Sequence, residues 1–359
     1  MPSSARTYRF GNKLVQINID GRRLERFVSQ QWAPFDAGAV HAKAPHAAIN
    51  IRQEERGDLP CHAEFEQCFY DNEVTVIADA QKTLACYFGR PPSNAFLTLK
   101  ADMEPSFAHY YVIEPLLLYL LRRLNVLQLH AAVLERNGKG ILIAGASGTG
   151  KSTASAALVG GGYSLLSDDR AFLAKAGRQT RLYANDPRIS LSDQSRKLFS
   201  PLGFLRPAEM RRRGKSGKRI YSPIRGREVG SGSVKPHLLI FTEPRRGKAT
   251  VLRPLPKAEA LARLLERKPI EYPVMLADGA GLTNELELCG RLVASARTFA
   301  MNFAGNPEEL PSLIDSLAGE LSGRGAGRSP ASKKKGASAG IRKREPGSRP
   351  PRGRKPSGR

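Results

Sequence analysis

A glycine-rich stretch near the middle of the chain constrains the fold more than any other feature. It reads Gly145-Ala-Ser-Gly-Thr-Gly-Lys-Ser152: a glycine, four variable residues, then Gly-Lys-Ser. This is the pattern of a phosphate-binding loop. The apolar run 141–144 precedes it and the helix-forming run 153–159 follows it, so strand, loop and helix come in the order that such a site needs. A chance glycine-rich turn seldom has both the fixed positions and these flanks. The sequence therefore predicts a nucleotide-phosphate site.

Each residue type in the loop has a physical role. The glycines let the backbone bend so that several N–H groups point at one anion, and the helix that begins near Lys151 adds the positive end of its dipole. Lys151 is expected to reach the outer phosphates, and Ser152 to hold magnesium. The predicted nucleotide-binding residues are Gly145, Ala146, Ser147, Gly148, Thr149, Gly150, Lys151, Ser152 and Thr153.

Two carboxylates follow the loop at a short distance. After the predicted helix ends at 160–162, residues 163–167 read as a strand that delivers Asp168 and Asp169 at its C-terminal end. Magnesium prefers oxygen ligands, and in phosphoryl transfer an aspartate commonly accepts the proton of the attacking hydroxyl. One carboxylate is therefore expected near the metal with Ser152, and the other as a base. Adjacent residues on a regular strand point to opposite faces, so at least one of them must lie where the strand ends.

A histidine lies beside the loop if the predicted hairpin forms. The segments 127–135 and 139–144 flank Asn137-Gly138, one of the stronger hairpin signals. With a two-residue turn, facing positions sum to 275 and His130 lies opposite Gly145. With a four-residue turn it lies opposite Ser147 instead. The sequence leaves open whether His130 is a catalytic group or a partly buried strand residue.

Positive charge for a phosphate could come from two places. Arg188 follows a polar turn and could clamp a phosphate or the transition-state charge. Lys218 or Arg219, in a basic segment, could do the same. For that segment a solvated charged surface explains the residues equally well.

The motifs together resemble a known family. His130 within Leu-His-Ala-Ala, the phosphate loop and the block Leu165-Leu-Ser-Asp-Asp169 look like the catalytic domain of HPr kinase/phosphorylase and its relatives. The resemblance covers roughly residues 115–321. It implies a mixed sheet around the loop, similar to the nucleotide domain of phosphoenolpyruvate carboxykinase. It also implies ATP- and Mg²⁺-dependent phosphorylation of a serine hydroxyl, with Asp168 as the base, Asp169 and Ser152 near the metal, and His130 beside the reacting phosphate.

Departures from the family limit what is carried over. Thr153 stands where the dual-function kinase/phosphorylases usually have an acidic residue, and their Gly-rich block after the aspartate pair is not recognisable here. Kinase chemistry is therefore expected more than phosphorolysis, and HPr itself is not inferred as the substrate. Oligomers are common among the relatives, so a homo-oligomer is a further possibility.

The whole chain is predicted to divide into three parts. Residues 1–105 read as a β-rich domain of short strands and loops, with Trp32 in a loop or partly buried. Residues 106–321 form the P-loop kinase-like α/β domain, beginning with an apolar helix from Pro115 to about Leu124 that is expected to pack between the two domains. Within it, residues 198–229 are expected to form a long loop without regular structure. Residues 322–359 are expected to be a disordered basic tail.

Charge and cysteine content bound the function. Of the formal net charge of +24, half lies in residues 322–359, which contain thirteen Lys or Arg and one acid, Glu345. Such a tail could contact nucleic acid weakly and in a salt-dependent way, although it has no aromatic residue for base stacking. Four cysteines show neither metal spacing nor a disulfide framework, and no run is long and apolar enough for a membrane span. We expect a cytoplasmic protein without a membrane segment.

Three functions remain open from the sequence. The first is a kinase acting on a serine of a protein or peptide. The second is a nucleotide-binding regulatory protein without catalysis. The third is a nucleic-acid-associated ATPase that uses the basic tail. The aspartate pair and His130 favour the first.

Overall fold

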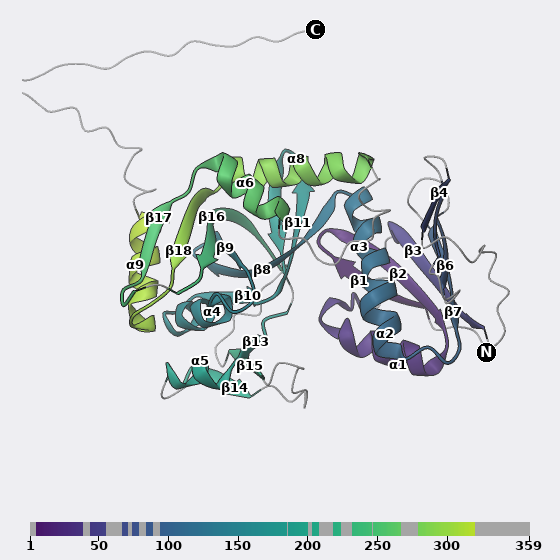
Figure 1. Cartoon of the computed structure of the whole chain (residues 1–359), viewed down its shortest axis with the longest axis horizontal. Coiled ribbons are helices and arrows are strands. Elements are labelled where there is room, and N and C mark those ends of the chain that lie inside the picture. The colour runs from purple at the N-terminus through teal and green to yellow at the C-terminus, as the bar shows by residue number, and fades with distance from the viewer. Residues whose placement is uncertain are drawn as a thin grey trace, which may run out of the picture. The chain divides into compact units, whose positions relative to one another are not determined.

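The computed structural model describes residues 5–38, 44–54, 67–70, 74–78, 84–88, 94–184, 186–199, 203–207, 218–223, 232–245, 247–266 and 279–319. Within these residues three β-sheets and their helices form a mixed α/β architecture (Figure 1), which confirms the predicted fold class at this level. The predicted tail, residues 322–359, lies outside the described residues. No helix in the described part of the chain is long and apolar enough to cross a membrane.

The first sheet gathers the strands of the N-terminal hundred residues. The three adjacent strands β2, β3 and β7 run parallel to one another, and the remaining pairs are antiparallel. Across the sheet the order is β1 (Ala5–Phe10), β2 (Lys13–Asp20), β3 (Ala47–Glu54), β7 (Asn94–Lys100), β6 (Leu84–Phe88), β5 (Val74–Ala78) and β4 (Gln67–Tyr70).

A helix that the sequence analysis missed covers this sheet. Helix α1 (Arg22–Gln31) follows β2, and the 3₁₀ turn η1 (Ala33–Phe35) follows it. Only Leu24 and Val28 of α1 are buried, so its apolar stripe is too short to stand out in the sequence. Trp32, expected in a loop or partly buried, lies between α1 and η1, but its ring is fully buried at 1% exposed and packs edge-on against Tyr8 and Phe10.

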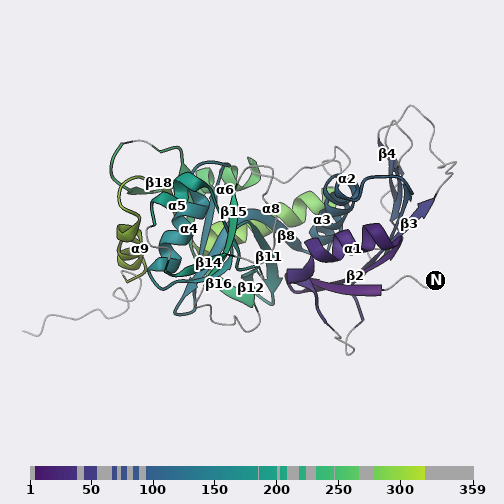
Figure 2. The same ribbon diagram turned by 90° about the horizontal axis from the view of Figure 1, so that it is seen from below.

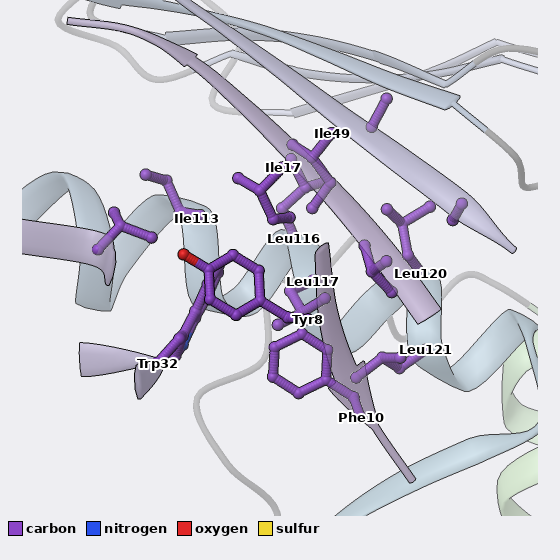
Figure 3. Close-up of a cluster of buried hydrophobic side chains, with 14 of the residues drawn as sticks. Tyr8, Phe10, Ile17, Trp32, Ile49, Ile113, Leu116, Leu117, Leu120 and Leu121 are labelled. Atoms are coloured by element: carbon purple, nitrogen blue, oxygen red, sulfur yellow. The ribbon is translucent and has the colours of Figure 1, made fainter. Parts of the chain in front are cut away.

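A run of helix after β7 supplies the other half of this core. It consists of α2 (Pro105–Phe107), the π-helical turn η2 (Ala108–Ile113) and α3 (Glu114–Arg123), so the predicted helix at Pro115 is present. Figure 3 shows the leucines of α3 lying against side chains of the first sheet. The apolar residues cover most of its circumference because α3 is buried. The shared core includes Leu116, Leu117, Leu120, Leu121, Ile17 and Ile49.

The second sheet carries the phosphate loop. Strand β9 (Lys139–Gly145) lies between β8 and β16, antiparallel to the first and parallel to the second. The path through the sheet is β10 (Ser164–Ser167), β8 (Val126–Arg136), β11 (Arg170–Ala176), β12 (Gln179–Tyr183), β16 (Ser233–Glu243), β18 (Arg297–Asn302) and β17 (Val251–Pro254).

Helices lie on both sides of this sheet (Figure 1). Helix α4 (Lys151–Gly160) lies on one side, and α6 (Lys257–Glu266) and α8 (Gly279–Ser295) lie on the other, where their apolar residues join the strands in a second core. The 3₁₀ turn η4 (Pro307–Glu309) and helix α9 (Leu310–Gly319) come last.

The predicted hairpin has the shorter of the two turns considered. Ala131 pairs with Ala144 and Arg136 with Lys139, so facing residues sum to 275. Asn137 and Gly138 both have positive φ, 53° and 76°, as a two-residue turn of this type requires. This register directs His130 towards the loop end of β9.

A small third sheet corrects the prediction of an irregular loop over 198–229. Strands β14 (Leu205–Pro207) and β15 (Arg219–Pro223) pair with each other, and β15 pairs with β13 (Ile189–Leu191). Helix α5 (Asp193–Lys197) follows β13. Buried Leu205 and Tyr221 supply the apolar contacts that make these short strands stable, and single apolar residues in a basic stretch are a weak sequence signal. The rest of 200–229 lies outside the described residues.

The predicted boundary at residue 105 stays a prediction. One apolar core contains residues from both sides of it, since Phe172 of β11 packs against Phe10 and Phe35 at ring-centroid distances of 5.7 and 5.6 Å.

These ring contacts give a test of the shared core. Phe172→Ala removes a fully buried ring and should lower the free energy of unfolding by about 3–5 kcal/mol, measured by urea denaturation. Phe96→Ala is the matched control, because its ring is 52% exposed and its loss should cost about 0.5 kcal/mol or less. Equal losses in the two variants would contradict a core that Phe172 shares with Phe10.

Candidate functional site

The predicted loop joins β9 to α4 with the expected backbone. Gly148 and Gly150 have φ of 83° and 96°, in the left-handed region that favours glycine. Gly150 is the N-cap of α4, which begins at Lys151. Ala146, Ser147 and Gly148 are exposed, so the N-terminal end of α4 is open to an anionic ligand.

A threonine that the sequence analysis did not single out holds the loop in place. Thr242 lies beside Gly145 in the pairing of β16 with β9. A Cβ on Gly145 would come within 1.9 Å of the Thr242 Oγ1, so only glycine fits there. The Thr149 hydroxyl lies 2.7 Å from the Thr242 Oγ1 and 2.7 Å from the Ala146 carbonyl oxygen. Thr242 is a polar residue near the end of an apolar run, 238–241, and this was the available signal.

Lys151 is folded back over the loop. Its side chain is largely buried, and Nζ donates to the Gly145 carbonyl oxygen at 2.8 Å and to the Ala146 carbonyl oxygen at 3.4 Å. The same Nζ lies 3.2 Å from His130 Nε2. The structure therefore brings the predicted histidine and lysine into contact.

His130 also contacts one of the two aspartates. Its Nδ1 lies 2.8 Å from Asp169 Oδ1, and the two side chains are 46% and 66% exposed. Burial raises the pKa of Asp169, but the hydrogen bond from His130 and the nearby positive charges outweigh this, so the pKa lies below its ordinary value. One of those charges is Arg170, which pairs across the strands with His130 and lies 3.3 Å from Glu114. His130 thus connects Lys151 to Asp169.

Asp168 points away from its neighbour into the protein. Its side chain is buried, and Oδ2 accepts a hydrogen bond from the Ser190 N–H at 3.3 Å. Oδ1 has no hydrogen-bond partner among the described residues. Burial raises the pKa of Asp168 above its ordinary value, against the opposing effect of the nearby Ser152 and Ser155 hydroxyls and the Ser190 N–H.

The strand pairing explains why the aspartates diverge. Strand β8 pairs with β11 through residues 126–130 and with β10 through residues 133–135. The register shifts between Leu165 and Ser167, and the Ser167 hydroxyl accepts from the Arg170 N–H at 3.1 Å. The register is the same on both sides of the aspartates, since Ser167 pairs with Val133 and Arg170 with His130. Asp168 and Asp169 therefore lie in a two-residue break in the pairing, where consecutive side chains point to opposite sides.

Arg188 is held in an ion pair of its own. Its guanidinium donates to both Asp186 oxygens at 2.5 Å, which raises the pKa of Arg188 further. The Asp186 carboxylate therefore offsets the positive charge that Arg188 was predicted to present to a phosphate. Arg219 is the first residue of β15 in the small sheet, and Lys218 directly precedes it.

A chain of hydroxyls links α4 to the small sheet. The Thr153 Oγ1 lies 2.9 Å from the Ser195 Oγ, which lies 3.0 Å from the Ser192 Oγ. Figure 2 shows α5 beside α4. Thr153, predicted as part of the loop, is buried and contacts α5 instead of lining the open end of the loop.

No group of three or more His, Cys, Asp or Glu side chains in the described ranges could hold a metal ion. A protein-only metal cage is therefore absent from this part of the chain. Magnesium at a nucleotide needs less, because it is bound by one or two protein oxygens together with phosphates and water. Ser152 and the two aspartates supply such oxygens at the loop.

One family model matches part of this chain. A family model described as SynChlorMet cassette protein ScmC matches residues 108–190, less than half of the chain. This segment contains the phosphate loop, His130 and both aspartates. A search of the curated proteins finds no match.

Among solved structures, the HPr(Ser) kinase/phosphatase from Coxiella burnetii is similar to this chain at 16% sequence identity, covering 54% of this chain and 95% of that one. The TM-score is 0.26, and a likeness of that size carries no argument about function.

The buried carboxylate gives a test of the site's electrostatics. A carboxyl whose pKa is raised by folding binds a proton in the folded state that the unfolded chain has lost, so its contribution to stability is lost as pH rises through the raised pKa. Asp168→Asn should therefore be more stable than the parent at pH 8, by about 1–3 kcal/mol, and this advantage should shrink towards pH 4. The measurement is denaturation at both pH values.

Asp102→Asn is the control, because Asp102 is exposed and its loss should change little at either pH. An Asp168→Asn variant that is less stable at pH 8 than at pH 4, relative to the parent, would contradict the raised pKa.

Proposed function

We propose that this chain is an ATP- and Mg²⁺-dependent phosphotransferase of HPr-kinase type, which phosphorylates a serine hydroxyl of a protein or peptide. The observation that carries the proposal is the buried carboxylate of Asp168, held beside the phosphate loop with one oxygen unpartnered among the described residues. A loop that only binds a nucleotide has no need for a base at this place. The proposal includes a P-loop kinase domain related to the nucleotide domain of phosphoenolpyruvate carboxykinase.

The residues present fit a nucleotide and its metal. The exposed loop and the N-terminal end of α4 offer N–H groups for phosphates, and Ser152 and Asp169 offer oxygens for Mg²⁺. Bound ATP would supply the phosphoryl group that passes to the serine oxygen, with ADP as the leaving group. The Lys151 ammonium, which now binds two loop carbonyls, is within reach of the same place and would turn to the phosphates.

Asp168 would hold the acceptor hydroxyl and take its proton. The Ser190 N–H fixes Oδ2, and the buried Oδ1 would accept a hydrogen bond from the serine after the side chains that cover it move aside. A raised pKa makes the carboxylate a better proton acceptor than an exposed aspartate, so burial supports this role. The proton would come to rest on Oδ1.

His130 would hold Lys151 and Asp169 in position at the open end of the site. It contacts Lys151 through Nε2 and Asp169 through Nδ1, so each ring nitrogen has a partner of its own. This arrangement orients the ring and holds Asp169 ionised beside the lysine. An ionised Asp169 is what a magnesium ligand requires.

One observation favours the opposite assignment of the two aspartates. The Ser152 hydroxyl acts on Asp168 and not on Asp169, so the two predicted oxygens for the metal are not yet side by side. With exchanged roles, Asp168 would hold the metal with Ser152, and Asp169 would be the base. The two assignments differ in how activity depends on magnesium.

Two other functions remain as alternatives. A regulatory protein without catalysis would bind ATP through the same loop and show no transfer. A nucleic-acid-associated ATPase would depend on the basic residues 322–359, so its turnover would fall when they are deleted.

A labelling experiment tests the proposal. The purified chain is incubated with γ-labelled ATP, Mg²⁺ and proteins of the native cytosol, and the modified residue is identified. Lys151→Ala should abolish ATP binding, and Asp168→Asn should lower transfer about a hundredfold or more. Asp169→Asn should raise the magnesium concentration needed for half-maximal rate. Asp102→Asn serves as the control and should transfer at the parent rate.

The outcomes separate the alternatives. If Asp168→Asn changes the magnesium requirement and Asp169→Asn changes the rate, the two roles are exchanged. Label on a small metabolite, or ATP binding without transfer to anything, would overturn the serine kinase proposal.

A further inference from the structure

The small sheet has one buried face and one open face. In its register Ser190 pairs with Ile220, and Arg206 pairs with Ser222. Since alternate residues of a strand share a face, these four side chains lie on one side of the sheet. They are all half-buried or exposed. The other side carries Ile189, Leu191, Leu205 and Tyr221, which are all buried, and also Arg219 at the start of β15, which is exposed.

The first strand of this sheet contacts Asp168, the proposed base. The Ser190 N–H of β13 donates to Asp168 Oδ2 at 3.3 Å. Helix α5, directly after β13, contacts α4 through Ser195 and Thr153 at 2.9 Å. An acceptor serine whose hydroxyl contacts Asp168 would therefore belong to a substrate polypeptide that passes beside the small sheet.

The small sheet and α5 carry a strong excess of positive charge. We call Lys197, Arg206, Lys218 and Arg219 the basic surface, which extends around both sides of the small sheet; three of them are exposed, and Lys218 is half-buried. The four elements β13, α5, β14 and β15 contain one acid, Asp193. Asp193 pairs with Arg196 at 2.9 Å and lies 3.8 Å from Arg219, so one carboxylate offsets only part of this charge. The segment 208–217, between β14 and β15, lies outside the described residues and is not included.

We infer that the acceptor serine lies in an acidic segment of a protein or peptide, and that the basic surface binds the carboxylates on either side of it. This inference rests on the proposed kinase function and adds the substrate class. Its basis is charge complementarity at the one place where an acceptor must pass. Arg188 cannot supply this recognition, because Asp186 neutralises it within the protein.

A nucleic acid backbone is the other polymer that a basic surface attracts. Single strands are held by aromatic rings on which bases stack, in addition to basic groups. The one aromatic residue in the strands and helix of this small sheet is Tyr221, and it is buried. The basic surface thus offers charge without stacking, which suits carboxylates better.

The test uses serine peptides that differ only in charge. Three sets of the same length carry acidic, neutral or basic residues around one serine, and the full-length protein phosphorylates each with γ-labelled ATP at 50 and 300 mM salt. Acidic peptides should be favoured over neutral ones by about tenfold in kcat/KM at low salt, and the preference should shrink at high salt. The preference should appear mainly in KM, because the contacts are made before and during transfer alike.

A double variant assigns the preference to the basic surface. Arg206→Gln with Arg219→Gln should reduce the ratio of acidic to neutral peptides to about threefold or less. The control, Arg26→Gln with Arg178→Gln, removes the same charge from exposed positions on α1 and after β11, and should keep the parent ratio. Thermal denaturation of both variants checks that they fold.

The outcomes distinguish the inference from the function on which it rests. If no peptide of any charge is labelled while ATP is bound, the kinase proposal fails. If peptides are labelled but neutral or basic ones equal the acidic ones, or if both double variants lose the preference alike, the inference is overturned. A single-stranded oligonucleotide that competes with the acidic peptides more strongly than an acidic peptide without serine would also overturn it, in favour of nucleic acid.

Discussion

Strand β8 is the element on which the site depends, because it hydrogen-bonds to three other strands. Along one edge it pairs with β9, which ends in the phosphate loop. Along the other edge it pairs first with β11 and then with β10, and Asp168 and Asp169 lie in the unpaired break between these two strands. His130 is on β8 itself, between these two edges. Pairing along both edges of this one strand thus brings the loop, the histidine and the carboxylates together.

The two carboxylates also differ in their electrostatic surroundings. One turns inwards, where desolvation raises its pKa, and the other turns outwards to a histidine and nearby positive charge, where its pKa is lowered. Two neighbouring acids in different environments are suited to different work, one to exchanging a proton and the other to holding a cation. The proposed chemistry uses this difference and does not require any unusual side chain.

Much of the second sheet could be predicted, because its signals are local. The Asn137-Gly138 turn set the hairpin register, and the register placed His130 at the loop. Helix α4 follows from the loop motif and its helix-forming residues, and the helices near the C-terminal end of the described chain have apolar periodicity. Predictions failed where stability comes from contacts distant in sequence. Helix α1 buries only two side chains, and Trp32 is covered by β1 and η2. The short strands β14 and β15 pair with each other, and β15 also pairs with the distant strand β13.

The sequence by itself determined the phosphate loop, its flanking strand and helix, and the presence of two carboxylates just beyond them. These follow from glycine conformation, apolar runs and residue order, which are properties of neighbouring residues. Only the tertiary structure decided that Asp168 is buried and Asp169 exposed, that Thr242 leaves no room for a side chain at position 145, and that Arg188 is paired with Asp186. Burial, close approach and charge pairing depend on which distant segments meet, so no local pattern encodes them.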